Sequence, residues 1–264
     1  TLFHVKAVKK TIEISKSSID LIGFHGQTIF HDPEKKITKQ LGDGKLLSQL
    51  TKKKVVYNFR QNDLDNGGQG APLTPIFHNV IANKINKEFN LEFPINILNI
   101  GGIANITATI NWKDFLSINK IQAYDIGPGN CLIDKWVRKN SKKNYDKGGF
   151  LAKSGKTDQL ILNQALENFN ENLYFEKSLD VKDFDIFFAK GLSLENGTAT
   201  ITDFTAKLIA NGMNYVHDAN QKKIYNWLVC GGGRKNNYLL ESIKNNFEKI
   251  NIELIDKYKV DGDF

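Results

Sequence analysis

The chain has 264 residues, of which 41% are hydrophobic and 25% charged, and its formal net charge is +7. This balance is typical of a globular protein with one large domain or two moderate ones. It argues against a membrane-spanning protein, because lysine, asparagine or aspartate interrupts every apolar run, and no secretory signal is visible. We therefore expect a cytoplasmic protein. Because it begins at Thr1 and not at methionine, we expect it to be part of a longer chain.

The positive charge does not indicate nucleic-acid binding. All but three of the 36 basic residues are lysines spread along the chain, and neither zinc-finger spacing nor an RNA-recognition aromatic motif occurs. Arg60 and Arg234 stand beside glycine clusters, where a planar guanidinium grips carboxylates or phosphates well, although chance also explains that placement. Cys131 and Cys230 are far apart and have no histidine at ligand spacing, so we expect neither a disulfide framework nor a zinc site.

Elements in the N-terminal half are predicted from apolar runs and from the positions of glycine and proline. Residues 65–72 hold too much glycine, with a proline, to form regular structure. The elements expected around them, in chain order, are a strand at 18–24, a polar turn at 25–28, a helix at 45–53, a strand at 55–59, a helix at 74–89, and a strand at 95–100 with a hairpin partner at 103–110.

The C-terminal half alternates strands and helices. Its predicted elements, in chain order, are a strand at 121–124, a helix at 131–139, a helix at 158–170, an irregular stretch at 184–191, a helix at 201–216, a strand at 223–229, a helix at 236–247 and a strand at 252–255. This alternation, with at least one hairpin, predicts an α/β fold with mixed sheets.

Glycine turns follow three of the predicted strands. The sequence has neither a P-loop nor the dinucleotide fingerprint. Instead it has Gly101-Gly102, Gly127-Pro128-Gly129-Asn130 and Gly231-Gly232-Gly233. A glycine turn lets the backbone approach a ligand closely, and a helix start after it presents N–H groups to an anion. One such turn usually only reverses the chain, but three favour a phosphate-binding cleft.

Asp125 is expected at the end of its strand, directly before the second glycine turn. A carboxylate in that place can act as a general base or hold a magnesium ion. It can equally cap the helix that begins near Asn130. Spacing alone does not separate these interpretations.

A second polar cluster is Asn58-Phe59-Arg60-Gln61-Asn62-Asp63, followed by the glycine-rich segment 67–73. Sugars are bound by such sets of carboxylate, amide and guanidinium groups, because each hydroxyl both donates and accepts. A structural ion pair between Arg60 and Asp63 is the alternative. His25, Gln27 and His31 form a third polar group, in which a structural role is the more common one.

The motifs together resemble one family, the anhydro-N-acetylmuramic acid kinases, over essentially the whole chain. Any one motif is only suggestive, whereas the ordered set is specific. The motifs that carry the resemblance are His25-Gly26-Gln27-Thr28, Gly67-Gly68-Gln69-Gly70-Ala71-Pro72-Leu73, Asn99-Ile100-Gly101-Gly102-Ile103-Ala104-Asn105, Asp125-Ile126-Gly127-Pro128-Gly129-Asn130 and Cys230-Gly231-Gly232-Gly233-Arg234-Lys235-Asn236.

The resemblance implies the two-domain fold of the sugar kinase, actin and heat-shock chaperone superfamily, which is of the ribonuclease H-like type. On this basis residues 1–57 are expected to be the remnant of an incomplete N-terminal domain I. Residues 58–255 are expected to form domain II, with the catalytic aspartate and the nucleotide-side turns. Residues 256–264 are expected to begin a truncated return to domain I.

The resemblance also implies a function, which is ATP-dependent phosphorylation of 1,6-anhydro-N-acetylmuramic acid. Water opens the anhydro ring, and the product is N-acetylmuramic acid 6-phosphate, formed during recycling of cell-wall peptidoglycan. Asp125 matches the catalytic base, which takes a proton from that water. The residues implied on the sugar side are Arg60, Asp63, Gly68, Gln69, His25 and Gln27.

The remaining glycine motifs are implied to bind the nucleotide. ATP and Mg²⁺ are the expected cofactors, and no metal ligand is assigned. The expected partners are the amino sugar and ATP, without nucleic acid or membrane, and relatives suggest a homodimer. The residues implied on the nucleotide side are Gly101, Gly102, Gly127, Gly129, Asn130, Gly231, Gly232 and Gly233, with Gly127 and Gly129 offering N–H groups to phosphates.

Departures from the family pattern occur inside the chain and at its ends. Asn58 stands where the family usually has aspartate, Ile126 where it has threonine, and Ser178-Leu179-Asp180 replaces a Ser-Thr-Gly segment. The family's first phosphate loop and its C-terminal Glu-Ala helix are not in this sequence. We therefore expect residues 1–264 alone to lack kinase activity.

Two other functions stay open from the sequence. One is a kinase of the same superfamily with a different acceptor, which the segment 67–73 argues against because it is not shared nucleotide machinery. The other is a non-catalytic nucleotide-binding relative, against which the intact Asp125 argues.

Overall fold

The computed structural model describes residues 1–109, 111, 121–169, 179–220, 225–247 and 250–263. The chain divides into two compact units, Thr1–Leu73 and Thr74–Phe264. The mixed α/β class predicted from the sequence is confirmed. In the described residues, no helix is both long and apolar enough to cross a membrane.

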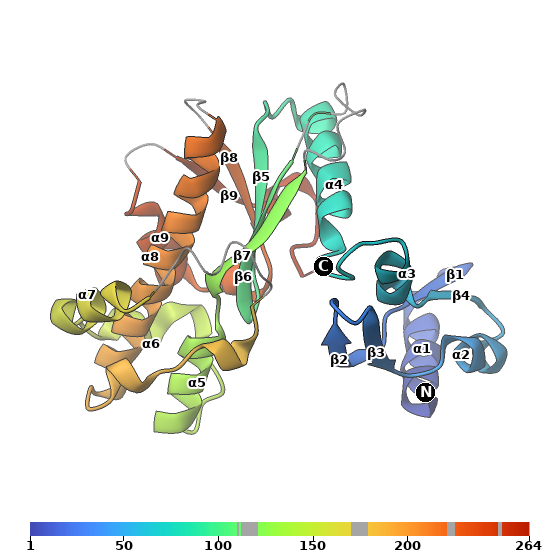
Figure 1. Ribbon diagram of the computed structural model, residues 1–264, viewed down its shortest axis with the longest axis horizontal. Coiled ribbons are helices and arrows are strands. Elements are labelled where there is room, and N and C mark those ends of the chain that lie inside the picture. The colour runs from blue at the N-terminus through green and yellow to red at the C-terminus, as the bar shows by residue number, and fades with distance from the viewer. Residues whose placement is uncertain (110, 112–120, 170–178, 221–224, 248–249, 264) are drawn as a thin grey trace. The chain divides into compact units, whose positions relative to one another are not determined.

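The first unit is built from three helices and two small sheets (Figure 1). Strands β1 and β4 pair in parallel, and β2 and β3 form an antiparallel hairpin with a register shift near Phe30. The hairpin and the first helix are absent from the sequence-based prediction. In chain order the elements are α1 (Leu2–Ser15), β1 (Leu21–Phe24), β2 (Gln27–Asp32), β3 (Ile37–Leu41), α2 (Gly44–Thr51), β4 (Lys54–Tyr57) and α3 (Phe59–Asp65).

The second unit is organised by one five-stranded mixed sheet with the order β7-β6-β5-β8-β9. Strand β6 is antiparallel to β5 and to β7, whereas β5, β8 and β9 run in parallel. The strands are β5 (Ile95–Ile100), β6 (Ile103–Ala108), β7 (Gln122–Pro128), β8 (Asn226–Cys230) and β9 (Asn251–Leu254).

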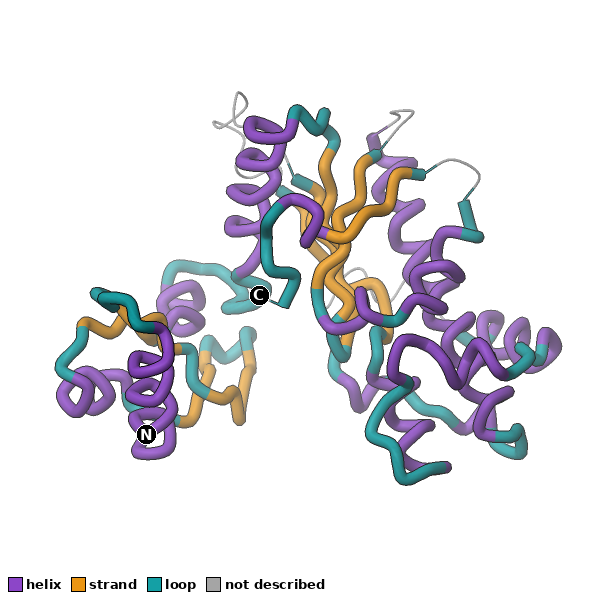
Figure 2. The backbone as a smooth tube through the Cα atoms, turned by 180° about the vertical axis from the view of Figure 1, so that it is seen from behind, coloured by secondary structure: helices purple, strands orange, loops and turns teal. Residues whose placement is uncertain are grey.

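Helices cover both faces of this sheet (Figure 2). The longest, α8 (Leu194–Asn220), begins seven residues before the helix that the sequence predicts. Its first turns hold Thr198 and Thr202, whose hydroxyls donate to carbonyls four residues back. The other helices are α4 (Thr74–Phe89), α5 (Cys131–Asn140), α6 (Phe150–Ser154), α7 (Gln159–Glu167) and α9 (Asn237–Lys244), with short 3₁₀ turns η2 (Lys147–Gly149), η4 (Val181–Asp183), η5 (Phe187–Ala189), η6 (Gly232–Lys235) and η7 (Ile255–Tyr258).

The core has two parts because side chains alternate across the central strands. In β5, Leu98 and Ile100 pack on the face covered by α5 and α8, whereas Ile95 and Ile97 pack on the opposite face. That opposite face is covered by Ile85 of α4 and by residues of η7. Every residue of β8 is buried, as expected for a strand with neighbours on both edges and helices on both faces.

Most predicted elements agree with the structure in type. The predicted ends at residues 110, 170, 223 and 224 lie outside the described residues. The strand predicted at 121–124 is longer in the structure, because it continues to Pro128 and so takes in Asp125 and Gly127. The cause is its pairing with β6, which a local pattern does not reveal. The domain boundaries after residues 57 and 255 stay predictions about the family's domains.

His78 of α4 ties this helix to the sheet. Its side chain is only 3% exposed, and Nδ1 lies 2.8 Å from the Thr107 hydroxyl on β6. Burial lowers the pKa of His78 from its ordinary value of 6.5 to about 4. The folded protein therefore holds His78 neutral at pH values where the unfolded chain is protonated.

This difference predicts a loss of stability in acid. Between about pH 6.5 and pH 4 the unfolded state binds one proton more than the folded state, so the free energy of unfolding falls as the pH falls, by at most about 3 kcal/mol. His78→Gln, which keeps a hydrogen-bonding side chain, should flatten this part of the curve. Urea unfolding at a series of pH values measures it, and an unchanged slope in the variant would contradict the assignment.

Candidate active site

Three glycine turns meet at one edge of the five-stranded sheet. Strands β5, β7 and β8 run in the same direction, so their carboxyl ends lie at the same edge. Gly101 follows β5, Gly129 follows β7 and Gly231 follows β8. In open α/β sheets, ligands bind outside the carboxyl ends of the strands. The structure thus gathers the predicted nucleotide-side segments into one region of the second unit.

Asp125 lies beside a β-bulge in β7. The ladder pairs Asn105 with Asp125 but Ala104 with Gly127, so Ile126 is the extra residue. Gly127 has a φ of +144°, a conformation that a side chain would strain. Bulges are common next to active sites because they redirect a neighbouring side chain. Ile126 itself packs against Gly212 of α8, where a Cβ on the glycine would lie only 2.6 Å from the Ile126 side chain.

The carboxylate of Asp125 is oriented by a backbone donor. The Leu179 N–H donates to Asp125 Oδ2 at 2.8 Å. The N-cap of α5 is Asn130, so Asp125 is not the cap of that helix. Of the two interpretations open from the sequence, the helix cap is wrong. Asp125 is instead a carboxylate at the carboxyl edge of the sheet, where a backbone N–H orients it and it can act as a general base.

The first two glycine turns are hydrogen-bonded to each other. The N–H of Gly129 donates to the Gly102 carbonyl at 2.9 Å, and that of Asn130 to the Gly101 carbonyl at 2.8 Å. The expectation that Gly129 offers its N–H to a phosphate therefore differs from the structure. The reason is close packing, because a Cβ on Gly129 would lie 2.4 Å from the Gly101 oxygen.

The third turn contains glycines of two kinds. A Cβ on Gly231 would lie 2.7 Å from the Ile100 carbonyl oxygen, and one on Gly233 would lie 2.2 Å from the Ile100 side chain. Gly232 is exposed, and a Cβ there would meet nothing within 4 Å. The outer glycines allow the turn to pack on β5, whereas Gly232 faces open space.

A hollow of about 290 Å³ lies between the second and third turns. It brings together Asn130 and Gly232, two residues assigned to the nucleotide from the sequence. It also contains residues that the sequence-based assignment missed. Some of them are close in sequence to Asn130 or to Gly233, whereas Tyr145, Asp146 and Gly148 had no such signal. These additional lining residues are Ile133, Asp134, Tyr145, Asp146, Gly148, Lys235 and Asn236.

On the first unit, Arg60 connects two of the predicted sugar-side segments. Its Nε donates to His25 Nε2 at 2.7 Å, and its Nη1 donates to the Gly70 carbonyl at 3.0 Å. Partial burial lowers the pKa of Arg60, but a guanidinium stays protonated and can only donate. His25 Nε2 must therefore accept, and His25 Nδ1 carries the proton that it donates to the Gly26 carbonyl at 2.8 Å.

Asp63 shapes the glycine-rich segment beside Arg60. Its Oδ2 accepts from the Gly70 N–H at 2.7 Å, and its carbonyl accepts from the Gly68 N–H at 2.8 Å. A Cβ on Gly68 would collide with the Asp63 carboxylate at 2.1 Å. The alternative of an Arg60–Asp63 ion pair is not what the structure has, because both residues bind Gly70 instead. Gln27 and Gln69 are exposed and do not join this group.

Arg234 holds the third glycine turn against the C-terminal segment. Its side chain is 5% exposed. It donates to both oxygens of Asp256 at 2.8 and 3.1 Å, to Asp263 at 2.5 Å and to the Gly231 carbonyl at 3.1 Å. These hydrogen bonds hold the pKa of Asp263 and of Asp256 below its usual range. The sequence left open whether Arg234 binds carboxylates or phosphates, and in the structure it binds carboxylates.

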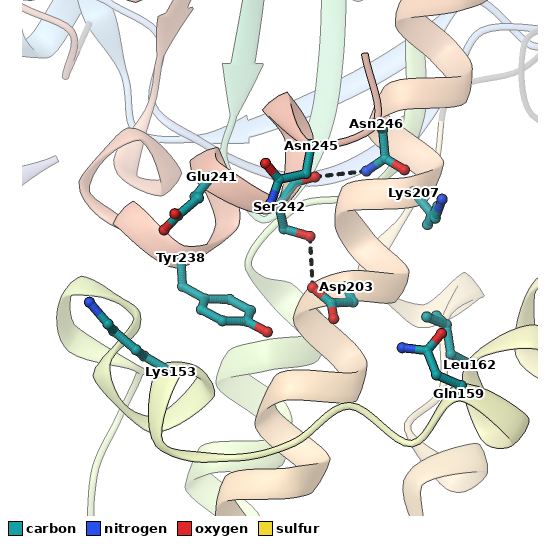
Figure 3. A pocket seen from close by; sticks show the side chains of 10 residues that line it. All are labelled: Lys153, Gln159, Leu162, Asp203, Lys207, Tyr238, Glu241, Ser242, Asn245 and Asn246. Carbon is teal, nitrogen blue, oxygen red and sulfur yellow. Dashed lines mark hydrogen bonds between the residues drawn. The ribbon is translucent and has the colours of Figure 1, made fainter. Parts of the chain in front are cut away.

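A larger hollow, of about 440 Å³, lies beside α8 and α9 (Figure 3). At its centre Asp203 accepts hydrogen bonds from Ser242, at 2.7 Å, and from Thr157. These bonds tie α8 to α9 and to the segment before α7. Neither Asp125 nor any glycine turn lines this hollow. Its central carboxylate is satisfied within the protein, so the chemistry is expected elsewhere.

Known proteins match this arrangement of motifs over nearly the full chain. The family model for anhydro-N-acetylmuramic acid kinase matches residues 3–264. The chain belongs to the anhydro-N-acetylmuramic acid kinase family. Proteins of that name from Pelagibacter ubique and Zymomonas mobilis are 51% and 36% identical over all of this chain, and one from Methylobacterium nodulans is 37% identical over 92% of it. The chain spans 69%, 68% and 62% of these relatives, respectively.

Solved structures of two dehydratase components are also similar, at lower levels. The activator of 2-hydroxyisocaproyl-CoA dehydratase from Clostridium difficile covers 88% of this chain, with 12% identity and a TM-score of 0.43 over 87% of its own length. Component A of (R)-2-hydroxyglutaryl-CoA dehydratase from Acidaminococcus fermentans covers 90%, with 15% identity and a TM-score of 0.45 over 92% of its own length.

The kinase-family residues lie on both units. The predicted sugar-side residues belong to the first unit, whereas Asp125 and all predicted nucleotide-side residues belong to the second. The departure at Asn58 has a local reason, since this residue has a φ of +63° at the N-cap of α3. Asparagine tolerates that left-handed conformation better than most residues.

The glycines of the third turn predict a matched pair of substitutions. Gly233→Ala should lower the free energy of unfolding by about 1–3 kcal/mol, because the new methyl group overlaps Ile100. Gly232→Ala should leave that free energy nearly unchanged, since its Cβ meets open space. Denaturant unfolding of both variants measures the difference. Equal destabilisation would contradict the packing described for this turn.

Arg234 and Lys235 predict a second matched pair. Arg234→Met leaves Asp256 and Asp263 without their main donor and should cost about 2 kcal/mol, less than fully buried pairs because these carboxylates are about half exposed. Lys235→Met removes only an exposed pair with Asp263 and should cost below about 1 kcal/mol. Thermal and denaturant unfolding test this order, and a reversed order would contradict it.

Proposed function

We propose that this chain carries the catalytic base and the nucleotide-side turns of an enzyme that phosphorylates 1,6-anhydro-N-acetylmuramic acid with ATP. The single observation behind the proposal is Asp125, held by the Leu179 N–H beside a bulge at the carboxyl edge of the sheet. Membership of the kinase family supports the type of reaction. The hollow at Asn130 and Gly232 supports a nucleotide site on this side.

In the proposed reaction, Asp125 takes a proton from a water molecule that attacks the anomeric carbon. The bond from this carbon to O6 breaks, and O6 takes over the electron pair. O6 then forms a bond to the γ-phosphorus of ATP, and ADP leaves. The products are N-acetylmuramic acid 6-phosphate and ADP, with the water proton on Asp125. Phosphoryl transfer needs mainly positioning and charge neutralisation, so the base and the turns are the essential parts.

Magnesium is expected to enter with the nucleotide. Mg²⁺ bound to ATP keeps several waters and uses the phosphates with one or two protein carboxylates. Because Asp125 is proposed as the general base, we assign it no role as a magnesium ligand, and the ion would neutralise phosphate charge on the nucleotide.

On the sugar side, we propose that Arg60, Asp63 and His25 form the binding wall. Arg60 and Asp63 both bind Gly70, which fixes the glycine-rich segment between them. His25, through its accepting Nε2, holds the Arg60 guanidinium in place. The remaining N–H groups of Arg60 are then positioned for an anionic or hydroxyl-rich ligand such as the muramic acid lactyl carboxylate.

Asp125→Asn tests the proposal. Because the chain spans 62–69% of its compared relatives, it is best assayed joined to the segments of the Pelagibacter ubique relative that it does not cover. The substitution keeps the shape and the Leu179 hydrogen bond but cannot accept the water proton, so kcat should fall by a factor of about 10²–10⁴. ADP release and mass spectrometry of the sugar product measure it.

Leu179 and Lys84 provide the controls. Leu179 contributes its backbone N–H, so Leu179→Val, which keeps a buried apolar side chain, should retain the Asp125 contact, and Lys84→Gln changes an exposed residue of α4 outside the site. Both variants should stay within about tenfold of the parent enzyme. Turnover by the Asp125→Asn variant at the parental rate would reject the general-base role.

A further inference from the structure

The hollow between the second and third glycine turns contains one carboxylate, that of Asp134, which accepts no hydrogen bond from another described residue. Asp146 is used internally, because it accepts from the N–H groups of Leu151, at 2.8 Å, and Ala152, at 3.0 Å. Asn236 accepts from the Leu239 N–H at 3.1 Å, and Lys235 donates to Asp263 at 2.6 Å. Asp134 differs from all three.

Asp134 has only a distant partner. Its carboxylate lies 3.8 Å from Arg138, and no hydrogen bond reaches it from another residue in the described ranges. The side chain is 30% exposed. Burial is the main cause that raises the pKa of Asp134, and Arg138 offsets it in part. Burying a carboxylate without hydrogen-bond donors costs free energy. A ligand that supplies such donors therefore binds favourably beside it.

The position of Asp134 suggests which part of a ligand reaches it. The Asp134 N–H donates to the Asn130 carbonyl at 2.8 Å, so the two residues lie one helical turn apart on the same side of α5. One turn advances about 5.4 Å along the helix axis. A nucleotide whose phosphates lie near the open backbone of Gly232 can then extend its sugar toward Asp134, which lines the same hollow.

The other walls agree with a nucleoside at this end of the hollow. Tyr145 presents a ring that is 55% exposed, whereas Ile133 is buried in the core beneath the hollow. Aromatic and apolar surfaces stack against bases without selecting their sequence. A vicinal diol offers two O–H donors, which match the two oxygens of a single carboxylate.

We propose that Asp134 accepts hydrogen bonds from the 2′ and 3′ hydroxyls of a nucleoside triphosphate bound in this hollow, and so selects ribonucleotides over deoxyribonucleotides. The proposal rests on the proposed function, in that it takes this hollow as the nucleotide site. It adds a specificity-determining residue that phosphate binding alone does not require. A purely structural Asp134 would instead serve the positive end of α5 and the pair with Arg138.

The test compares three ligands on the chain joined to the segments of the Pelagibacter ubique relative, as in the activity test, with Mg²⁺ present. ATP, 2′-deoxy-ATP and 3′-deoxy-ATP are titrated by calorimetry into the parent chain and into Asp134→Ala. The parent should bind ATP about tenfold more tightly than either deoxy analogue, as expected for a lost hydrogen bond to a charged group. The variant, which loses both hydrogen bonds, should bind all three with nearly equal affinity, below that of the parent for either deoxy analogue.

Arg138→Gln is the matched control, because it removes the ion-pair partner of Asp134 but keeps the carboxylate. It should preserve the tenfold preference for ATP. Asp134→Asn, which keeps the size of the side chain, serves if the alanine variant does not fold, and should reduce the preference in the same direction. Unfolding temperatures of all variants identify losses caused by misfolding.

The outcomes separate this proposal from the proposed function. If Asp134→Ala weakens or strengthens binding of all three nucleotides equally, the ribose role is wrong while the nucleotide site stands. A parent chain with no preference for ATP over its deoxy analogues leads to the same conclusion. If the parent binds none of the three, the nucleotide assignment of the hollow fails, and the ribose role fails with it.

Discussion

The carboxyl edge of the five-stranded sheet depends on backbone segments that approach one another more closely than side chains permit. A Cβ on Gly129 would lie 2.4 Å from the Gly101 oxygen, and one on Gly231 would lie 2.7 Å from the Ile100 oxygen. The hydrogen bonds of Gly129 and Asn130 to the turn after β5 form only at this separation. Glycine is therefore required here first for packing, and the approach of a ligand is a second consequence.

Asp125 depends on this constraint. Gly127, in its positive-φ conformation, allows the bulge that places Asp125 opposite Asn105, and Ile126 anchors the bulge against Gly212 of α8. The base is thus held from the backbone on one side and from the core on the other. Such positioning limits the freedom of a catalytic group before the substrate binds.

The third turn is held in a different way, by charge. Arg234 is almost completely buried and neutralised by Asp256 and Asp263 from the C-terminal segment, so the turn and that segment stabilise each other. The Gly231 N–H adds a hydrogen bond of 2.7 Å to the Gly262 carbonyl. The hollow beside Gly232 therefore has one wall fixed by packing and another fixed by ion pairs. Asp134 is the carboxylate in this hollow that has unused acceptors.

The sequence by itself determined the order of strands and glycine turns, the helix after Asn130 and the family, because local propensity and short motifs carry that information. It did not reveal α1, where only Val5 is buried, nor the hairpin of β2 and β3. Only the tertiary structure decided that β7 continues through Asp125, that the Gly129 N–H donates to a carbonyl within the protein and that Arg234 binds carboxylates. Each of these depends on a partner distant in sequence, and the geometry of such pairs exists only after the sheet has formed.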